Sequence, residues 1–441
     1  MSEMSARRFH IETLGCPKNA VDSDKVFATL LADGMLPAED AEHADVVVVN
    51  TCAFIEAARQ ESIDVALTLA ERKRPGAKLV ITGCMAERYG DELAAALPEA
   101  DAVVGFEGEA ALGDVVLRRK PVGVRDLLEL PRPKPSAPWA YVKIAEGCDR
   151  ACAFCAIPSF RGKQRSRTPE SIVAEARALV EQGVAELVLV AQDLAWYGRD
   201  VGQPGSLAPL LHQLDALAAL GLQRVRLLYL YPSEVRDPLI ATMLELPTVV
   251  PYFDLSLQHA SRPLLRKMNR WGNGDRFRGI IEGLRAQEPN ATFRSSFIVG
   301  FPGETEEDHE QLLEFLDDAR LDWAGFFPFS REDGTPAASM EDVVDDALMR
   351  ERLRECSSMQ EPITTAARAA LLGQEVEVLV DGCDEDESGD REAVGRTHRE
   401  APEIDGVVRI VGDLFARPGA IVRATVCGVE GPDLEAKACT S

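Results

Sequence analysis

The chain has 441 residues, of which 46% are hydrophobic and only 6% aromatic, and its formal net charge is −25. No apolar run reaches the roughly 18 residues of a membrane-spanning helix, and the N-terminus lacks the apolar core of a secretory signal. We therefore expect a cytoplasmic protein without membrane association. Its acidic balance favours a basic partner over a nucleic acid.

Short apolar runs alternate with helical stretches in the first third of the chain. Strands are predicted at residues 8–15, 45–51, 78–83 and 102–106, with helices at 20–34, 54–73 and 86–97. This alternation predicts an α/β domain with an open, mainly parallel sheet. A proline-rich connector, PRPKPSAP, follows it. We place the first domain at 1–130 and the connector at 131–138.

Six strand candidates separated by helical segments follow the connector. They lie at residues 139–145, 186–192, 224–230, 252–258, 293–299 and 323–329. Six βα units predict a partial, TIM-like (β/α)6 barrel over 139–363, with a long helix at about 341–372. Short strands at 375–382, 392–398, 406–412 and 420–429 then predict a small all-β barrel over 364–441.

Three of the ten cysteines, Cys148, Cys152 and Cys155, have the spacing C-x3-C-x2-C directly after the first barrel strand. Thiolates packed this closely repel one another unless a soft metal centre neutralises them. Structural zinc is the alternative, but it requires four ligands and no fourth cysteine or histidine is near. Three cysteines can hold a 4Fe–4S cluster with one open iron, and this spacing resembles that of the radical S-adenosylmethionine enzymes.

Cys16, Cys52 and Cys84 stand in similar contexts, LGC, NTC and TGC, each after a predicted strand. Residues beyond the carboxyl ends of parallel strands line one crevice, so these three can converge. The alternative is that each is a small buried core residue. Cys356, Cys383, Cys427 and Cys439 show no such pattern and receive no role.

With both triplets in place, the chain resembles the methylthiotransferases over essentially its whole length. The motifs that carry the resemblance are TLGCPKNAVDSD, NTCAFI, TGCMAERY, EGCDRACAFCAIPSFRGKQRSR, FIVGFPGETEED and FSREDGTPA. The resemblance implies an N-terminal domain with three cysteines, a radical S-adenosylmethionine core and a C-terminal TRAM barrel. It implies that Cys16, Cys52 and Cys84 ligate an auxiliary 4Fe–4S cluster, and that Cys148, Cys152 and Cys155 ligate the radical-generating one.

The implied cofactors are thus two 4Fe–4S clusters and S-adenosylmethionine. One S-adenosylmethionine would donate a methyl group to a cluster-bound sulfur. A second would yield the radical that removes hydrogen from an unactivated carbon, which no side-chain base near neutral pH can deprotonate. The resemblance also places Phe154 beside the adenine. It assigns no catalytic side chain, sulfur donor or residue that aligns the substrate carbon.

Two branches of the family differ in substrate. One modifies an adenosine in tRNA, and the other modifies the β-carbon of an aspartate in protein twelve of the small ribosomal subunit. LGCPKN and EAPEIDG resemble the ribosomal-protein branch. The C-terminal barrel carries 8 basic and 16 acidic residues from 364 to 441, a net charge of 8 − 16 = −8, which disfavours tRNA. We expect a monomer that receives electrons from a flavodoxin or ferredoxin.

Other candidate residues lie at predicted strand ends, where a barrel has its catalytic mouth. Gln192 ends the second strand, and the turn with Gly300 and Gly303 follows the fifth. The resemblance puts this turn beside the S-adenosylmethionine pocket, although an ordinary tight turn is the alternative. Arg294 could bind the cofactor carboxylate or form an ion pair inside the barrel. The basic segment 161–167 is either a solvated loop or a contact for an anionic substrate.

Overall fold

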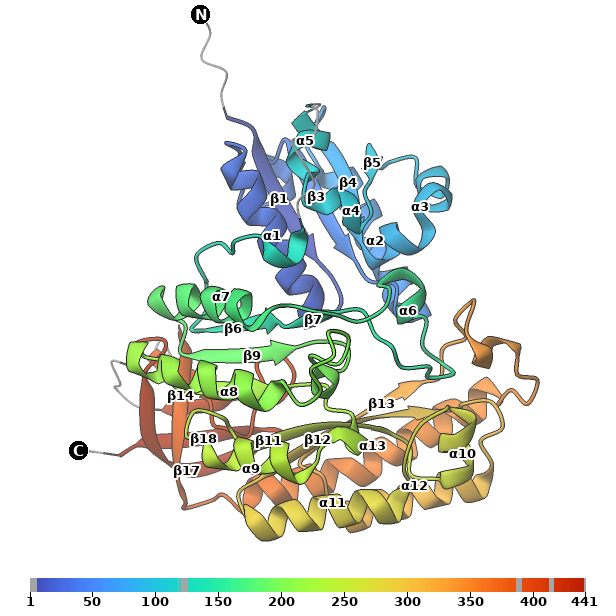
Figure 1. Ribbon diagram of the computed structural model, residues 1–441, viewed down its shortest axis with the longest axis vertical. Helices are drawn as coiled ribbons and strands as arrows, with labels where there is room; N and C mark the ends of the chain where they lie inside the picture. Colours follow the sequence, from blue (N-terminus) through green and yellow to red (C-terminus); the bar gives the residue numbers. More distant parts are fainter. Residues whose placement is uncertain (1–5, 118, 120–125, 386–390, 412–415, 440–441) are drawn as a thin grey trace, which may run out of the picture.

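The computed structural model describes residues 6–117, 119, 126–385, 391–411 and 416–439. An N-terminal α/β domain sits over a central barrel of parallel strands, and a small closed β-barrel packs against the starts of those strands (Figure 1). The predicted fold class is therefore confirmed. Within the described ranges, no helix is long and apolar enough to cross a membrane.

The N-terminal domain is built on a parallel sheet with strand order β2-β1-β3-β4-β5. The strands are β1 (Arg8–Thr13), β2 (Leu36–Pro37), β3 (Val46–Thr51), β4 (Lys78–Gly83) and β5 (Ala102–Val103). The helices are α1 (Pro17–Ala32), α2 (Glu56–Arg72), α3 (Cys84–Ala96), α4 (Phe106–Glu109) and α5 (Leu112–Leu117). All six residues of β3, VVVVNT, are buried because helices cover both faces of the sheet.

The central barrel has six parallel strands in two three-stranded sheets, which isolated bridges join between the third and fourth strands. The strands are β6 (Trp139–Lys143), β9 (Glu186–Val190), β10 (Arg224–Leu227), β11 (Tyr252–Gln258), β12 (Thr292–Val299) and β13 (Trp323–Pro328). The flanking helices are α7 (Pro169–Glu181), α8 (Leu207–Asp215), α9 (Asp237–Glu245), α11 (Gly274–Gln287) and α12 (Glu306–Ala319). Shorter elements lie in the loops that follow the barrel strands: β7 (Ala145–Glu146), β8 (Arg165–Ser166), α6 (Ile157–Phe160) and α10 (Arg262–Lys267).

The long predicted helix is α13 (Asp346–Ala369), and it runs through the boundary that the sequence places between residues 363 and 364. After it, β14 (Glu375–Glu385), β15 (Arg391–Arg396), β16 (Val408–Val411), β17 (Ile421–Glu430) and β18 (Asp433–Ala438) close a barrel. The sequence predicts the first four of these, with residue 412 outside the described part. It misses β18, DLEAKA, because alanine, lysine and acidic residues have low strand propensity.

The chain from the end of β15 enters the barrel where its strands begin, and we call residues 396–405 the plug segment. Its backbone carbonyls accept hydrogen bonds from three strand side chains: Arg224 to Arg396 at 2.7 Å, Arg226 to His398 at 2.8 Å and Trp323 to Arg399 at 2.7 Å. Ala401 is fully buried among aromatic side chains of the barrel interior. The plug segment thereby closes one end of the barrel, and the N-terminal domain lies over the other.

Candidate functional site

Cys16, Cys52 and Cys84 each follow a strand of the N-terminal sheet at its carboxyl end. Cys16 caps α1 after β1, Cys52 comes directly after β3, and Cys84 comes directly after β4 and opens α3. Because β1, β3 and β4 are neighbours in the sheet, their carboxyl ends meet at one edge. Cys16 and Cys52 both raise the pKa of Cys84 by charge repulsion, in addition to the larger effect of burial. The structure thus brings the three thiols within electrostatic reach of one another.

Two glycines let these loops approach closely. Gly83 has φ +88°, and a Cβ there would lie 2.6 Å from the carbonyl oxygen of Thr51. Gly15 has φ +96°, and its Cβ would lie 3.0 Å from the Sγ of Cys52. Only glycine adopts such a conformation without strain and leaves room for the neighbouring backbone. The convergence of the thiols therefore depends on glycine beside Cys16 and Cys84.

A buried arginine from the central domain completes the surroundings of this triplet. Arg161 donates hydrogen bonds to the Sγ of Cys84 at 3.0 and 3.3 Å, to Asn19 Oδ1 at 2.6 Å and to both oxygens of Glu146 at 2.9 Å. Its guanidinium also lies 4.7 Å from the ring centre of Phe106. Arg161 therefore stabilises negative charge on sulfur and links the two domains.

The electrostatics of the three thiols differ. Burial alone would raise the pKa of Cys16, but the charges of Lys18 and Arg161 and nearby backbone N–H groups lower it below the usual value. Burial raises the pKa of Cys84 to about 12 despite Arg161. Three thiolates in this place require further positive charge, which a bound metal centre supplies. The donor set therefore fits a cysteine-ligated metal centre.

Cys148, Cys152 and Cys155 lie on the loop between β7 and α6, at the mouth of the barrel. Side chains and backbone groups at the ends of other barrel strands hold this loop: Arg150 pairs with Asp193 and Glu234, Asn269 donates to the carbonyl of Ala151, and Ala337 donates to that of Ala153. Arg270 donates to the Sγ of Cys152 at 3.4 Å. The barrel thus fixes the loop from several sides.

These thiols also influence one another. Burial is the largest cause that raises the pKa of Cys148 to about 11 and that of Cys155 to about 12, and the thiolate of Cys152 contributes to both rises. In the described part of the chain, no three cysteine, histidine or carboxylate side chains are grouped closely enough to hold one metal ion. Neither triplet therefore shows the four-ligand set of a structural zinc site. Three cysteines at this spacing fit a 4Fe–4S cluster that keeps one iron open.

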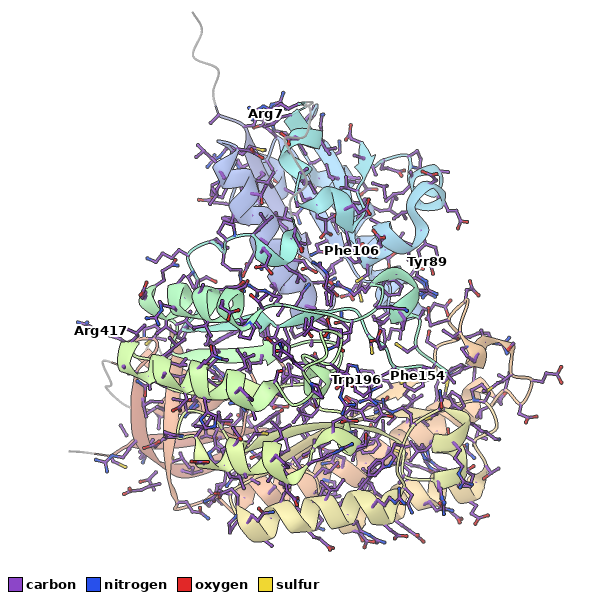
Figure 2. The ribbon with its side chains drawn as sticks, in the orientation of Figure 1. Arg7, Tyr89, Phe106, Phe154, Trp196 and Arg417 are labelled. Carbon is purple, nitrogen blue, oxygen red and sulfur yellow. The ribbon has the colours of Figure 1, made fainter. Side chains whose placement is uncertain are left out.

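Gln192 lies beside the cysteine loop, and Phe154 is part of that loop. The Nε2 of Gln192 donates to Glu146 at 2.7 Å, whereas its Oε1 and the Oδ1 of Asp193 are buried with no hydrogen-bond partner among the described residues. Phe154 is partly buried against the barrel core at the mouth (Figure 2). Unpaired buried acceptors fit a ligand that donates hydrogen bonds, such as an ammonium group.

Arg294 forms the ion pair that the sequence leaves open as the alternative to cofactor binding. It contacts Asp254 at 2.9 Å and Asp405 of the plug segment at 3.6 Å. In the basic segment 161–167, Arg161 is buried and the exposed Arg165 pairs with Asp126. Lys163 is exposed and has no ion-pair partner among the described residues. Neither of the two interpretations offered for this segment describes Arg161, which acts on the cysteines instead.

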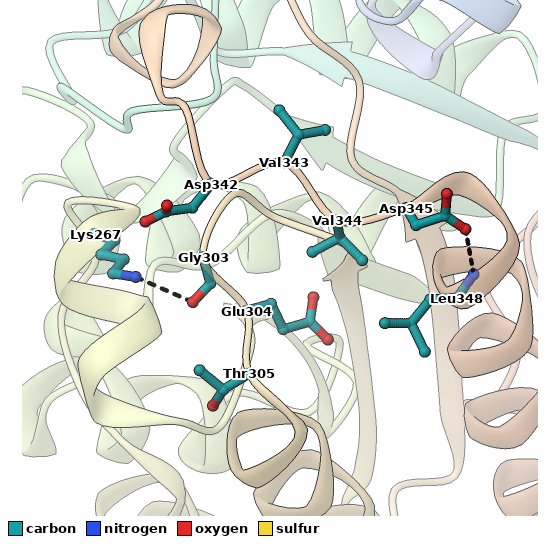
Figure 3. A pocket seen from close by; sticks show the side chains of 9 residues that line it. All are labelled: Lys267, Gly303, Glu304, Thr305, Asp342, Val343, Val344, Asp345 and Leu348. Carbon is teal, nitrogen blue, oxygen red and sulfur yellow. Dashed lines mark hydrogen bonds between the residues drawn. The ribbon is translucent and has the colours of Figure 1, made fainter.

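Gly300 and Gly303 lie in a turn that packs against helices. A Cβ at Gly300 would lie 2.5 Å from Met349 of α13, and one at Gly303 would lie 2.2 Å from the Nζ of Lys267. Gly303 also lines a pocket of about 430 Å³, shown in Figure 3. Its lining mixes acidic and apolar side chains and comprises Lys267, Gly303, Glu304, Thr305, Asp342, Val343, Val344, Asp345 and Leu348. In this structure the turn therefore contacts protein side chains, and its contact with cofactor stays a prediction.

Glu304 in this turn gives a testable pH dependence. Burial raises the pKa of its carboxyl group from 4.5 to about 7, although backbone N–H groups and Arg352 oppose the rise. The folded state then holds a proton that the unfolded state releases, so stability falls as pH rises from about 4.5 to 7, by on the order of 3 kcal/mol. Denaturant unfolding of wild type and Glu304→Gln across this range should show a flatter profile for the variant. Equal slopes would contradict the assignment.

Gly147, the residue before Cys148, gives a second prediction. It has φ +74°, and a Cβ would lie 2.2 Å from the carbonyl oxygen of Lys163. Gly147→Ala should displace the cysteine loop and reduce cleavage of S-adenosylmethionine on the order of 100-fold. Iron content and 5′-deoxyadenosine formation measure this after anaerobic reconstitution. Gly279→Ala, in open space on α11, is the matched control, and equal activity of both variants would sink the prediction.

Two residues at the boundary between the domains, Lys18 and Tyr229, were not predicted from the sequence to belong to the site. Tyr229 follows β10 with φ 63°, and Lys18 lies 3.8 Å from its ring centre. The rule that strand ends line the mouth, which singled out Gln192, applies equally to Tyr229. The sequence analysis instead placed Tyr229, the first tyrosine of LLYLYP, within the predicted strand 224–230.

Three family models match the chain. They are the uncharacterized protein family UPF0004 over residues 8–105, the Radical SAM superfamily over 142–316 and the TRAM domain over 372–439. Among solved structures, the radical S-adenosylmethionine methyltransferase TsrM from Kitasatospora setae is similar, with a TM-score of 0.55 and 14% identity. The likeness covers 75% of this chain and 77% of that one. It supports the arrangement of the α/β domain and the barrel.

Curated relatives match from end to end. The ribosomal protein uS12 methylthiotransferase RimO of Nocardioides sp. is 42% identical, with 96% of each chain covered. RimO of Anaeromyxobacter sp. (strain K) is 44% identical, with 97% of this chain and 92% of the relative covered. With this identity over nearly the full length of both chains, the protein belongs to the RimO family of ribosomal protein uS12 methylthiotransferases.

Proposed function

We propose that this chain is a radical S-adenosylmethionine transferase that adds a methylthio group to the β-carbon of an aspartate in ribosomal protein uS12. The observation that carries the proposal is the pair of cysteine triplets on either side of one polar network. Arg161 contacts Cys84 of the first triplet and Glu146, two residues before Cys148 of the second. The relatives named as uS12 methylthiotransferases supply the substrate.

Each triplet would hold one 4Fe–4S cluster, the first through Cys16, Cys52 and Cys84 and the second through Cys148, Cys152 and Cys155. When bound, the two clusters and S-adenosylmethionine would supply a methyl group, a sulfur and a radical able to remove hydrogen from an unactivated carbon. Arg161 would stabilise the charge on Cys84. Burial of Gln192 and Asp193 leaves acceptors for the cofactor's ammonium group.

The charge of the surroundings supports a protein substrate over tRNA. The C-terminal barrel has a net charge of −8, the wrong sign for neutralising phosphates. Acidic surfaces instead steer basic partners such as ribosomal proteins.

EAPEIDG, one of the segments that resemble the ribosomal-protein branch, forms most of the plug segment and contacts the barrel interior. It is therefore placed to support the barrel.

We further propose that the enzyme acts as a monomer in the cytoplasm, where its ribosomal substrate is made. Reduction of the cluster at the barrel mouth requires an external electron donor, for which a flavodoxin or ferredoxin has the required potential range. The acidic surface of the chain does not repel a ribosomal protein, and the described residues include no membrane-spanning helix.

The stoichiometry of S-adenosylmethionine consumption tests this function. The anaerobically reconstituted enzyme, supplied with S-adenosylmethionine, a reductant and uS12, should yield one S-adenosylhomocysteine and one 5′-deoxyadenosine for every methylthio group transferred. Formation of only one of them alongside modified uS12 would contradict a reaction that uses the cofactor for two purposes.

A further inference from the structure

Three lysines have largely buried side chains in the described part of the chain, and one of them has no carboxylate partner. Lys25 pairs with Glu175 at 3.1 Å, and Lys143 pairs with Asp22 and with Glu146 at 2.7 Å. Lys18 is only 9% exposed, yet among the described residues its Nζ has no carboxylate within 4.0 Å and no hydrogen-bond partner. Its Nζ is not one of the fully buried atoms without a partner, so the end of this side chain still reaches solvent and is open to a group that comes from outside.

The position of Lys18 is unfavourable for a cation. It lies in the first turn of α1, where the helix dipole disfavours positive charge. Its Nζ instead lies 3.8 Å from the centre of the Tyr229 ring, across the boundary between the domains. Cation–π contact holds an ammonium in place and leaves its N–H groups available to an anion. Lys18 is thus held over Tyr229, beside Cys16, with N–H groups that no carboxylate of the described residues accepts from.

Tyr229 is itself held in an unfavourable conformation. Its φ of 63° lies in the left-handed region, which is strained for a residue with a side chain. Two backbone hydrogen bonds impose it: its N–H donates to Asp254 at 2.9 Å, and its carbonyl accepts from the N–H of Leu194 at 3.2 Å. Strain of this kind collects at ligand sites, where it orients a side chain. Here it turns the ring toward Lys18 at the barrel mouth.

Other cations near the triplets are already engaged. The N–H groups of Arg161 donate hydrogen bonds to Cys84, Asn19, Asp22 and Glu146. Arg150 forms ion pairs with two carboxylates. Lys18 is therefore the buried cation beside the first triplet with unused donors, two residues from Cys16.

We propose that Lys18 binds the side-chain carboxylate of the target aspartate and that Tyr229 holds its ammonium for this contact. The inference rests on the proposed function. The β-carbon of an aspartate is bonded to the carboxylate carbon, so fixing the carboxylate beside Cys16 also positions the carbon that receives the methylthio group. An adenosine base carries no carboxylate, so Lys18 also distinguishes the protein substrate from tRNA. Lys18 is a positioning and specificity-determining residue.

The competing role for Lys18 is to neutralise charge on the Cys16 triplet. Binding separates the two roles. Two uS12 peptides that differ only in the target residue, aspartate or asparagine, are titrated into the reconstituted holoenzyme and followed by fluorescence anisotropy. Wild type should bind the aspartate peptide roughly 10- to 100-fold more tightly, the range expected for a hydrogen bond to a charged group. Lys18→Met should bind both peptides equally, while Lys18→Arg should keep part of the preference.

The control is Lys134→Met, which removes one exposed charge in the connector and should behave like wild type. Iron content should be the same in Lys18→Met and wild type, which shows that the variant still assembles its clusters. A preference for aspartate that persists in Lys18→Met overturns the inference, whatever the reduction potential of the first-triplet cluster does. Absence of methylthio product from the wild-type enzyme and uS12 would instead overturn the proposed function, so the two failures are distinguishable.

Discussion

Replacement of Cys148, Cys152 or Cys155 by alanine is expected to abolish reductive cleavage of S-adenosylmethionine, whereas replacement of Cys16, Cys52 or Cys84 is expected to preserve it. The second group should still lose methylthio transfer completely. The reason lies in the division of the triplets between domains. Residues at the mouth of the barrel hold the loop with Cys148, Cys152 and Cys155. The N-terminal sheet holds Cys16, Cys52 and Cys84. Each variant should lose the iron of its own cluster alone.

The measurement pairs iron and sulfide content with two product assays, 5′-deoxyadenosine and modified uS12. Losses of at least about 1,000-fold are expected, since a missing thiolate ligand removes the group on which the step depends. Cys427→Ala, an exposed cysteine of β17, serves as the control and should be fully active. Transfer of a methylthio group by Cys52→Ala would contradict the assignment, as would loss of S-adenosylmethionine cleavage in that variant with the second cluster intact.

Replacement of Glu186 by alanine is expected to destabilise the protein by about 3–5 kcal/mol, the usual cost of breaking a buried ion pair. Glu186 is fully buried at the start of β9 and contacts Arg226 and Arg396, each at 2.7 Å. Its removal leaves the buried guanidinium of Arg226 without a counter-ion, whereas Arg396 keeps its contact with Asp381 at 2.6 Å. Since Arg396 begins the plug segment, contact between the C-terminal barrel and the central barrel should loosen as well.

Denaturant unfolding and hydrogen exchange in the plug segment measure this effect. The two arginines lower the pKa of Glu186 to about 2 against the opposing effect of burial. The stabilisation is therefore present above about pH 4.5 and is lost as pH falls toward 2. Glu310→Ala, an exposed residue of α12, should change stability by less than about 0.5 kcal/mol. A Glu186→Ala variant as stable as that control would show that the network contributes nothing.

Much of the fold was predictable because strand and helix periods are local. VVVVNT and ELVLVAQ are apolar runs that can only be buried strands, and both lie in parallel sheets as expected. The convergence of Cys16, Cys52 and Cys84 follows from one general rule about parallel strands. The same rule explains why the loop with Cys148 meets the ends of β9 and β10 through Arg150.

What could not be predicted depends on contacts between segments far apart in the chain. Arg161 reads as part of a solvated basic run, and only the docking of two domains places it on Cys84. Arg294 suits a carboxylate ligand, but Asp405 of the plug segment occupies it. The plug segment could not be predicted locally, because EAPEIDG shows neither the alternation of a strand nor the hydrophobic spacing of a helix. Lys18 stands out only when the partners of every buried lysine are known.

Competition between uS12 and unmodified tRNA tests whether this enzyme modifies an aspartate of uS12. Both are offered anaerobically to the reconstituted enzyme with S-adenosylmethionine and a reductant, and the products are examined by tandem mass spectrometry. We expect a methylthio group on the β-carbon of one uS12 aspartate and none on tRNA. A methylthio group on an adenosine of the tRNA, with uS12 unchanged, would contradict it.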